Sequence, residues 1–335
     1  MKPFNFLTAP LLPLIALSLC FTAAAQENPQ NPQQTIRVGV DRVNVGVIVT
    51  DHNGHFVEGL HRQDFQVFDN GIEQPISGFT AIEEPGQVLF LIEAGPAIYL
   101  LGKSHIRASD TLLKNLSPND RVAIASYSRS AELVLDFTAD KPRAQFALQN
   151  LSFALGYAEL NLASSLGSAI DWLAASSGKI TVIVLSTGID TSTPQKWQVI
   201  QQKLRTSDVR VLAVSLSGDL RRPAKGRKLS PKEREDRAWV KEGFAQADEW
   251  LRELSQAAGG RVYLPKNEKE FELAYSEIAQ LVRHEYSIAF TPPANDGQVH
   301  TIQVKVKRLW CRVDHRQAYI APFPSSEPGS ASPTK

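Results

Sequence analysis

Val88-Leu89-Phe90-Leu91-Ile92-Glu93-Ala94-Gly95-Pro96-Ala97 is the stretch of sequence that decides the fold. An unbroken apolar run of this length, closed by a carboxylate and small residues, is typical of a strand that is buried on both faces. Three further apolar runs cover residues 122–125, 180–185 and 209–216. Amphipathic helical patterns alternate with these runs. One of them places six apolar residues on a single face: Val240, Phe244, Ala247, Leu251, Leu254 and Ala258. The sequence therefore predicts an α/β domain over residues 87–283, with a mostly parallel sheet covered by helices.

The two flanks of this region have a different hydrophobic period. Apolar residues alternate with polar ones or glycine over residues 35–84 and again over residues 284–322. A period of two indicates antiparallel strands with one buried face. Asp69-Asn70-Gly71 is a turn signal, and residues 292–297 are expected to form a hairpin turn. Neither flank has enough strands to be stable alone, so we expect both to pair into one β-sandwich that carries the α/β domain as an insertion.

The N-terminus is typical of an export signal. Lys2 precedes an apolar stretch at about residues 6–16, and Ala23-Ala24-Ala25 follows. The apolar stretch is short for a membrane span and contains two prolines, so we predict a signal peptide over residues 1–25, cleaved after Ala25. Residues 26–34, rich in Asn, Gln and Pro, are expected to be a flexible leader, and residues 323–335 a disordered tail. The predicted location of the protein is periplasmic or extracellular, with no membrane span in the mature chain.

Cleavage after Ala25 would leave Cys311 as the single cysteine, so no intramolecular disulfide is expected. The formal net charge of +1 falls to about 0 once Lys2 is removed. A neutral chain gives no indication of a nucleic-acid or anionic-membrane partner. The basic residues within 218–237 are interpreted as a solvated insertion, because acidic residues neutralise part of the run and no aromatic residues are interleaved.

The α/β region resembles a von Willebrand factor A (vWA) domain. Asp120-Arg121-Val122-Ala123-Ile124 is similar to the entry of its second strand, and residues 179–185 are similar to its fourth strand. The flanks resemble those of the VWFA-related proteins common in acidobacteria, over roughly residues 36–322. The similar segments are Asp51-x-x-Gly54, Val57, Gly59-Leu60, 64–71, Gln74 and Phe79 before the domain, and 286–292, 300–306 and 319–322 after it.

The resemblance implies where a metal site would lie. Metal-binding vWA domains hold a divalent cation between three loops at the carboxyl end of the sheet. The first loop offers Asp-x-Ser-x-Ser, the second a Thr and the third an Asp. At these positions the present chain has Glu93, Gly95, Ala97, Ser164 and Thr187. These residues supply one charge at most, and hard cations require more carboxylate oxygen. We therefore expect a degenerate site with no metal and no cofactor. Glu93 is expected to be held by N–H groups of nearby loops.

No other pattern predicts catalysis. His52-x-x-His55 lies in a predicted turn, Cys311 has no activating partners in sequence and is expected to be a buried thiol, and Ser126 and Ser186 lack a nucleophile elbow. The predicted function is a non-enzymatic, exported protein-interaction module that binds a protein partner directly. The candidate partner-binding rim consists of Glu93, Pro96, Asn161, Ser164, Thr187 and Asp190. The alternatives are a metal-dependent adhesin that uses Glu93, Ser164 and Asp190, a hydrolytic enzyme, and a structural envelope component.

Overall fold

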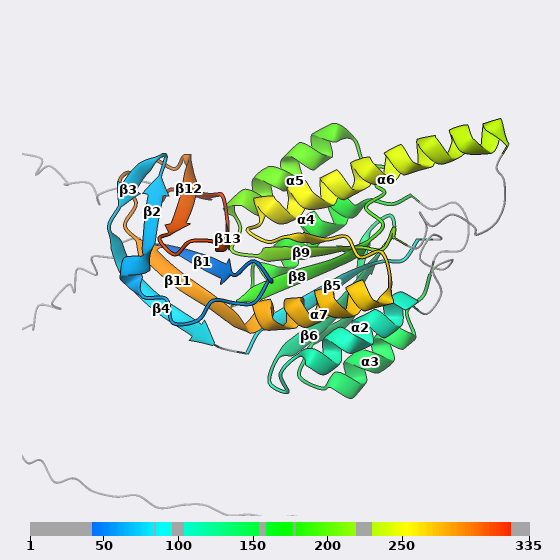
Figure 1. Cartoon of the computed structure of the whole chain (residues 1–335), viewed down its shortest axis with the longest axis horizontal. Helices are drawn as coiled ribbons and strands as arrows, with labels where there is room; N and C mark the ends of the chain where they lie inside the picture. The colour runs from blue at the N-terminus through cyan, green and yellow to red at the C-terminus, as the bar shows by residue number, and fades with distance from the viewer. Residues whose placement is uncertain are drawn as a thin grey trace, which may run out of the picture. The chain divides into compact units, whose positions relative to one another are not determined.

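A six-stranded sheet forms the centre of the α/β region (Figure 1). The computed structural model describes residues 42–83, 85–95, 104–153, 159–176, 179–218 and 230–322. The sheet order is β10-β9-β8-β5-β6-β7. The strands are β5 (Gln87–Glu93), β6 (Arg121–Tyr127), β7 (Ala131–Thr138), β8 (Ile180–Ser186), β9 (Arg210–Ser215) and β10 (Val262–Tyr263). All neighbouring strands are parallel except β7, which pairs with β6 antiparallel. The predicted fold class is confirmed.

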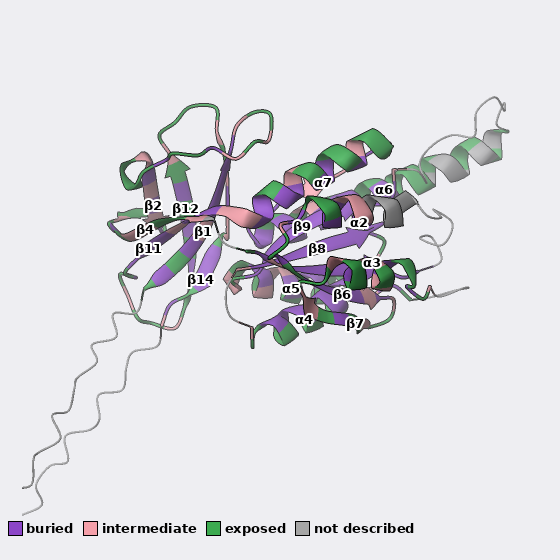
Figure 2. Ribbon diagram, turned by 90° about the horizontal axis from the view of Figure 1, so that it is seen from below, coloured by how far each residue is buried: buried purple, intermediate pink, exposed green. Residues whose placement is uncertain are grey.

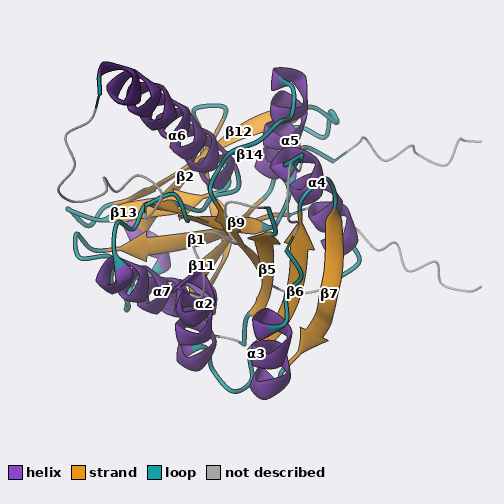
Figure 3. Ribbon diagram, turned by 90° about the vertical axis from the view of Figure 1, so that its right-hand side faces the viewer, coloured by secondary structure: helices purple, strands orange, loops and turns teal. Residues whose placement is uncertain are grey.

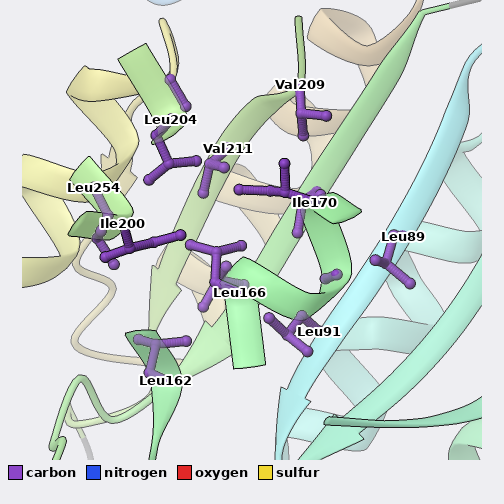
Figure 4. Packing of buried hydrophobic residues seen from close by; sticks show 14 of the residues in the cluster. Leu89, Leu91, Leu162, Leu166, Ile170, Ile200, Leu204, Val209, Val211 and Leu254 are labelled. Atoms are coloured by element: carbon purple, nitrogen blue, oxygen red, sulfur yellow. The ribbon is translucent and has the colours of Figure 1, made fainter. Parts of the chain in front are cut away.

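Helices cover both faces of this sheet. One face carries α2 (Ser104–Asn115), α3 (Lys141–Gln149) and α7 (Glu268–Arg283), and the other carries α4 (Leu162–Leu173), α5 (Pro194–Thr206) and α6 (Pro231–Ala257). Along β5, Val88, Phe90 and Ile92 pack into the first layer, whereas Leu89 and Leu91 pack into the second. Figure 4 shows Leu89 and Leu91 with Leu166, Ile170 and Ile200 of the second layer. This alternation explains why every residue of the apolar run in β5 had to be apolar: each side chain meets a helix.

Two glycines after α6 make a close turn possible. Gly259 has a φ of 66°, a left-handed conformation that L side chains rarely adopt. A Cβ on Gly260 would lie 2.0 Å from the carbonyl oxygen of Val211 in β9. The chain therefore passes directly against the sheet at this point before it enters β10, and only glycine fits there.

Strands from the two flanks of the chain pair with each other. The first antiparallel sheet has the order β13-β1-β11-β4 and the second has the order β14-β12-β2-β3. Their bounds are β1 (Val43–Thr50), β2 (Phe65–Asp69), β3 (Ile72–Gln74), β4 (Ile76–Glu83), β11 (His284–Phe290), β12 (Val299–Val306), β13 (Arg312–His315) and β14 (Ala318–Ile320), with a 3₁₀ helix η1 (Arg62–Asp64). Both sheets contribute to one apolar cluster that includes Val45, Val67, Ile288 and Val304. Exposed and buried residues alternate along most of β12, and Figure 2 colours these strands by burial.

The expected hairpin turn at residues 292–297 is wrong. β11 pairs with β1 and β4, whereas β12 pairs with β2 and β14, so the two strands belong to different sheets. The segment between them is a crossing from one sheet to the other. Alternating patterns on both sides of a turn look the same in either case, which is why the sequence favoured the simpler connection. The turn at Asn70-Gly71 does join β2 to β3, with φ values of 47° and 83°.

Charged side chains join the antiparallel strands to the α/β region. Arg261, just before β10, binds Asp314 of β13 and lies 2.6 Å from Glu277 of α7. Glu285 of β11 is 2.9 Å from Arg210 of β9 and 3.5 Å from Lys179. Figure 3, coloured by secondary structure, labels β9, β11, β13 and α7, which carry residues of these ion pairs.

Several sequence-based predictions lie outside the described residues. These are the signal peptide (1–25), the leader (26–34), the tail (323–335), Pro96, Ala97 and most of the basic insertion. Among the helices that the structure describes, none combines the length and the apolar character that a membrane crossing requires. Cys311 is half-buried rather than buried, and its neighbours Leu309 and Trp310 are exposed.

Candidate functional site

The carboxyl ends of three neighbouring strands meet at Glu93. Glu93 is the last residue of β5 and lies in register with Tyr127, the last residue of β6. On the other side of β5, strand β8 ends at Ser186, and Thr187 follows it. Because the strands are parallel, their last residues come together at one edge of the sheet. The predicted first and third loops are therefore adjacent, and Glu93 and Thr187 are in contact.

The carboxylate of Glu93 is fully buried and accepts several hydrogen bonds. The backbone N–H of Thr187 donates to Glu93 Oε2 at 2.8 Å, and the Thr187 hydroxyl donates to the same oxygen at 2.8 Å. The Ser186 hydroxyl donates to it at 2.9 Å. The Tyr127 hydroxyl donates to Ser186 Oγ at 2.7 Å and lies 3.4 Å from Glu93 Oε2. The second oxygen, Oε1, lies 3.1 Å from the Thr187 hydroxyl. All these donors are neutral.

Burial dominates the electrostatics of this cluster. It raises the pKa of the Glu93 carboxyl above its ordinary value of 4.5, and the hydrogen bonds from Thr187, Ser186 and Tyr127 oppose that rise. Burial and the nearby Glu93 carboxylate raise the pKa of the Tyr127 phenol well above 10. Within the described part of the chain, no Lys, Arg or His forms an ion pair with Glu93. The cluster is a desolvated network of hydroxyl groups around one carboxyl group.

Gly95 lies where a side chain would collide with a leucine. A Cβ on Gly95 would be 2.7 Å from Cδ2 of Leu160 and 3.5 Å from Oε1 of Glu93. Leu160 is buried, and its backbone oxygen accepts a hydrogen bond from Thr191 N–H at 2.7 Å. The space that a serine side chain at position 95 would require is therefore occupied by an apolar side chain.

Asp190 faces the start of α4. Its Oδ2 accepts a hydrogen bond from Ala163 N–H at 3.0 Å, and its Oδ1 accepts one from Ser192 N–H. Asp190 therefore caps a helix whose own N-cap residue, Asn161, makes no capping bond with its side chain. The Asn161 amide instead donates to the carbonyl of Arg129 at 3.0 Å, and Ser192 Oγ lies 3.3 Å from its oxygen. These bonds tie the second loop to the third.

Ser164 lies apart from Glu93, on the exposed side of α4. It lines a cavity of about 380 Å³ between α4 and α5, together with Asp171, Val199 and Lys203. The Lys203 ammonium lies 2.5 Å from Asp171 and donates to the carbonyl of Gly167 at 3.1 Å. The structure thus brings Glu93, Gly95 and Thr187 together, puts Asp190 and Asn161 on the loop edge above α4, and leaves Ser164 outside the buried cluster.

Three residues of this site were not among the predicted rim residues. Tyr127 and Ser186 complete the hydrogen-bond network of Glu93, and Leu160 fills the space beside Gly95. Tyr127 and Ser186 are polar residues that end apolar runs, and this was the available signal. In the described ranges, no group of three or more His, Cys, Asp or Glu residues is arranged to hold a metal ion.

Comparison with known proteins gives structural matches alone. No family model matches the chain, and no curated protein matches it. Three similar solved structures are a von Willebrand factor type A protein from Catenulispora acidiphila, the protein BatB from Bacteroides thetaiotaomicron, and proximal thread matrix protein 1 from the mussel byssus. The first is 14% identical, with 77% of this chain and 74% of that chain covered and a TM-score of 0.45. The second is 14% identical (58% and 98% covered, TM-score 0.42), and the third is 12% identical (61% and 48% covered, TM-score 0.41). At such identities the likeness concerns the vWA-like fold and nothing further.

Proposed function

We propose that this protein is an exported, non-enzymatic interaction module, and that its α/β region binds a protein partner directly, without a bridging metal ion. The observation that carries the proposal is the state of Glu93. Its carboxylate is fully buried and is occupied by donors from Thr187, Ser186 and Tyr127. A buried carboxyl group that accepts these hydrogen bonds holds the end of β5 against the loop after β8.

The residues at the vWA metal positions do not fit a divalent cation. The fold family would place a cation above the first strand, where it needs several oxygen ligands. Gly95 supplies no side-chain oxygen, and Leu160 fills the adjacent space. The Thr187 hydroxyl is committed to Glu93, and Asp190 is committed to the start of α4. No step through a metal is therefore part of the proposal.

The composition of the loop edge supports a protein partner. Ile189 is an exposed apolar residue on the third loop, and the polar residues Asp190 and Ser192 of the same loop bond to Ala163 and Asn161 of the second loop. A small apolar centre with a polar rim is the usual anatomy of a protein interface. Both titratable groups of the buried cluster, Glu93 and Tyr127, are out of reach of a substrate. Export rests on the signal-like sequence of residues 1–25.

Site-specific cross-linking in the producing cell tests the partner and its position. A photoreactive residue is placed at Ile189 or at Asn161, and as a matched control at Phe146, which is exposed on α3. We expect the same protein adduct from Asn161, which belongs to the predicted rim, and from Ile189, which precedes the rim residue Asp190, with no such adduct from Phe146 and no change in yield with EDTA. Adducts that vanish with EDTA would contradict the metal-free part of the proposal. Adducts from Phe146 alone would contradict the position of the rim.

Calorimetric titration of Mg²⁺ and Mn²⁺ into the protein tests the metal directly. We expect no binding in the micromolar range. Micromolar binding that Glu93→Gln abolishes would overturn the proposal in favour of a metal-dependent adhesin.

A further inference from the structure

The loop between β12 and β13 presents two large apolar side chains to solvent. Trp310 is 87% exposed and Leu309 is 79% exposed, the highest values among the large apolar residues that the structure describes. Trp310 also has a φ of 60°, a left-handed backbone conformation that is uncommon for a bulky residue. Single exposed apolar residues are normal on protein surfaces, but two adjacent ones at a loop tip call for an explanation.

The base of this loop is fixed to the antiparallel sheets. The backbone N–H of Lys307 donates to the carbonyl of Asp64 at 2.9 Å. On the other side of the tip, Cys311 and Val313 pack against the apolar cluster that the two sheets share. The tip therefore projects from an anchored base, and the indole is held outward instead of folding back onto the surface.

Positive charge surrounds the tip. Residues 298–313 contain Lys305, Lys307, Arg308 and Arg312, and no Asp or Glu. Arg312 is paired with Asp314 at 3.0 Å, and the Lys305 ammonium lies over the ring of Phe68. Lys307 and Arg308 are exposed, and neither forms an ion pair within the described ranges. Acidic side chains on the neighbouring segments include Glu58, Asp64 and Glu73, of which Asp64 accepts a hydrogen bond from His61 and Glu73 accepts one from Gln66.

We propose that this loop docks the protein onto a bilayer that contains anionic phospholipid. Tryptophan prefers the boundary between headgroups and acyl chains, where its ring is in an apolar layer and its N–H remains hydrated. Leu309 adds apolar area beside it. Lys307 and Arg308 lie where they would meet the lipid phosphates. Two side chains and two cations give reversible attachment, far weaker than a membrane span.

The local arrangement explains why overall charge gave no sign of this surface. The formal net charge of the chain is +1, so the basic tip is balanced by acidic residues elsewhere. A membrane responds to the charge within about one Debye length of the contact, which is about 10 Å at ordinary salt. The surface lies on the antiparallel strands and is independent of the rim around Ile189 and Asn161.

Vesicle co-sedimentation tests the proposal with the protein as the cell exports it, its N-terminus determined by mass spectrometry. We expect binding to vesicles of mixed phosphatidylglycerol and phosphatidylcholine, weaker binding to phosphatidylcholine alone, and loss of binding at high salt. Trp310→Ala should lower the partition coefficient at least about tenfold. The double variant Lys307→Gln/Arg308→Gln should lower it about 30-fold, since each cation near an anionic surface contributes about fivefold.

Matched variants test whether the loss of vesicle binding is specific to this loop or follows from removing any exposed aromatic or cationic side chain. Phe146→Ala removes an exposed aromatic residue from α3, and Lys114→Gln/Arg143→Gln removes two exposed cations from α2 and α3. Both should bind vesicles as the unmodified protein does. Lipids brominated on the acyl chain should quench the fluorescence of the unmodified protein more than that of Trp310→Phe, which places the indole inside the acyl boundary.

Three outcomes would overturn the proposal. They are unchanged vesicle binding by Trp310→Ala, equal quenching of the unmodified protein and Trp310→Phe, and dimerisation in solution that Trp310→Ala abolishes without any vesicle binding. The last outcome would assign the loop to a contact between two copies. Each variant is first compared with the unmodified protein by circular dichroism, and Trp310→Phe keeps the test valid if Trp310→Ala does not fold.

Discussion

Glu93 is the residue at which burial and hydrogen bonding oppose each other. Removal from water disfavours its charged form, whereas donors from Thr187, Ser186 and Tyr127 favour that form. The balance leaves the pKa of Glu93 raised. A raised carboxyl pKa means that the folded protein holds this proton more tightly than the unfolded chain does.

Glu93→Gln should change the pH dependence of stability in a defined direction. The contribution of Glu93 is largest below its unfolded pKa of 4.5 and decreases as pH rises through the folded pKa. Glutamine does not titrate, so the stability of the variant relative to the unmodified protein should increase with pH across that window. The increase is about 1.4 kcal/mol per tenfold difference between the two acid dissociation constants. Urea unfolding at a series of pH values measures it. Glu132→Gln, an exposed site on β7, should leave the curve unchanged.

Gly95→Ser would restore one serine of the vWA motif, and we expect it to destabilise the protein. Its Cβ would meet Leu160 at 2.7 Å, and overpacking of this kind costs about 1–3 kcal/mol. The affinity for Mg²⁺ should not rise. In a double-mutant cycle with Leu160→Ala, the two costs should sum to more than the cost of the double variant, because the smaller side chain admits the serine. Additive costs would show that Leu160 is not the obstacle.

At this scale the sequence predicted the residues that follow from position along a strand. Glu93 and Thr187 end adjacent apolar runs, so their proximity could be inferred. Tyr127 ends the neighbouring strand β6, a position that the apolar run before it indicated, whereas Leu160 belongs to the site through contacts between loops distant in sequence, which no periodicity encodes. Ser164 was placed by resemblance, and the structure puts it on the exposed side of α4.

Among the elements, the passage from α6 to β10 depends most strongly on residue type. Gly260 lies where a Cβ would be 2.0 Å from the Val211 carbonyl oxygen. Gly260→Ala should therefore lower the free energy of unfolding by about 3 kcal/mol, since backbone must shift. Gly243, in the middle of α6, has no neighbour within 4 Å of the position that a methyl group would occupy, so Gly243→Ala should stabilise the protein by about 0.5–1 kcal/mol. Chemical denaturation of both variants checks the pair, and equal effects would contradict the steric argument.

The sequence predicted the buried strands better than the exposed one. The apolar runs of β5, β8 and β9 arise because helices cover both faces of these strands. β7 has four exposed residues out of eight and lies at the sheet edge, so its apolar run is short, Leu133-Val134-Leu135, and charged residues flank it. The crossing at residues 292–297 was mistaken for a hairpin because β11 and β12 pair with different strands of the N-terminal flank, β1 and β2, which are remote in sequence.

For the whole molecule, Arg261 is a side chain that connects several distant elements. It is buried and binds Asp314 of β13, Glu277 of α7 and Thr50 of β1. Arg261→Ala leaves Glu277 without this cation and Asp314 with Arg312 alone, and we expect a loss of about 3 kcal/mol. Asp208→Asn removes the partner of Arg316 at an exposed position and should cost at most about 1 kcal/mol.

Calorimetry distinguishes two consequences of the Arg261 change. A single transition at lower temperature would mean that the antiparallel sheets and the α/β region still unfold together. Two separate transitions would mean that Arg261 couples them, which is the result we expect. A variant as stable as the unmodified protein would contradict both. The period change along the chain indicated which residues belong to each part, whereas a contact such as Arg261 with Asp314, fifty-three positions apart, had no signature in the sequence.

The pairing of β4 with β11 has a mechanical consequence. These strands lie side by side, with Glu83 opposite His284, and the chain leaves the first and returns to the second with the whole α/β region between them. When the two chain ends are pulled apart, tension reaches the α/β region only after this ladder of hydrogen bonds has broken. The hydrogen bonds between β4 and β11 therefore shield the α/β region from tension, and the rim at the ends of β5 and β8 keeps its shape while the protein bears a load.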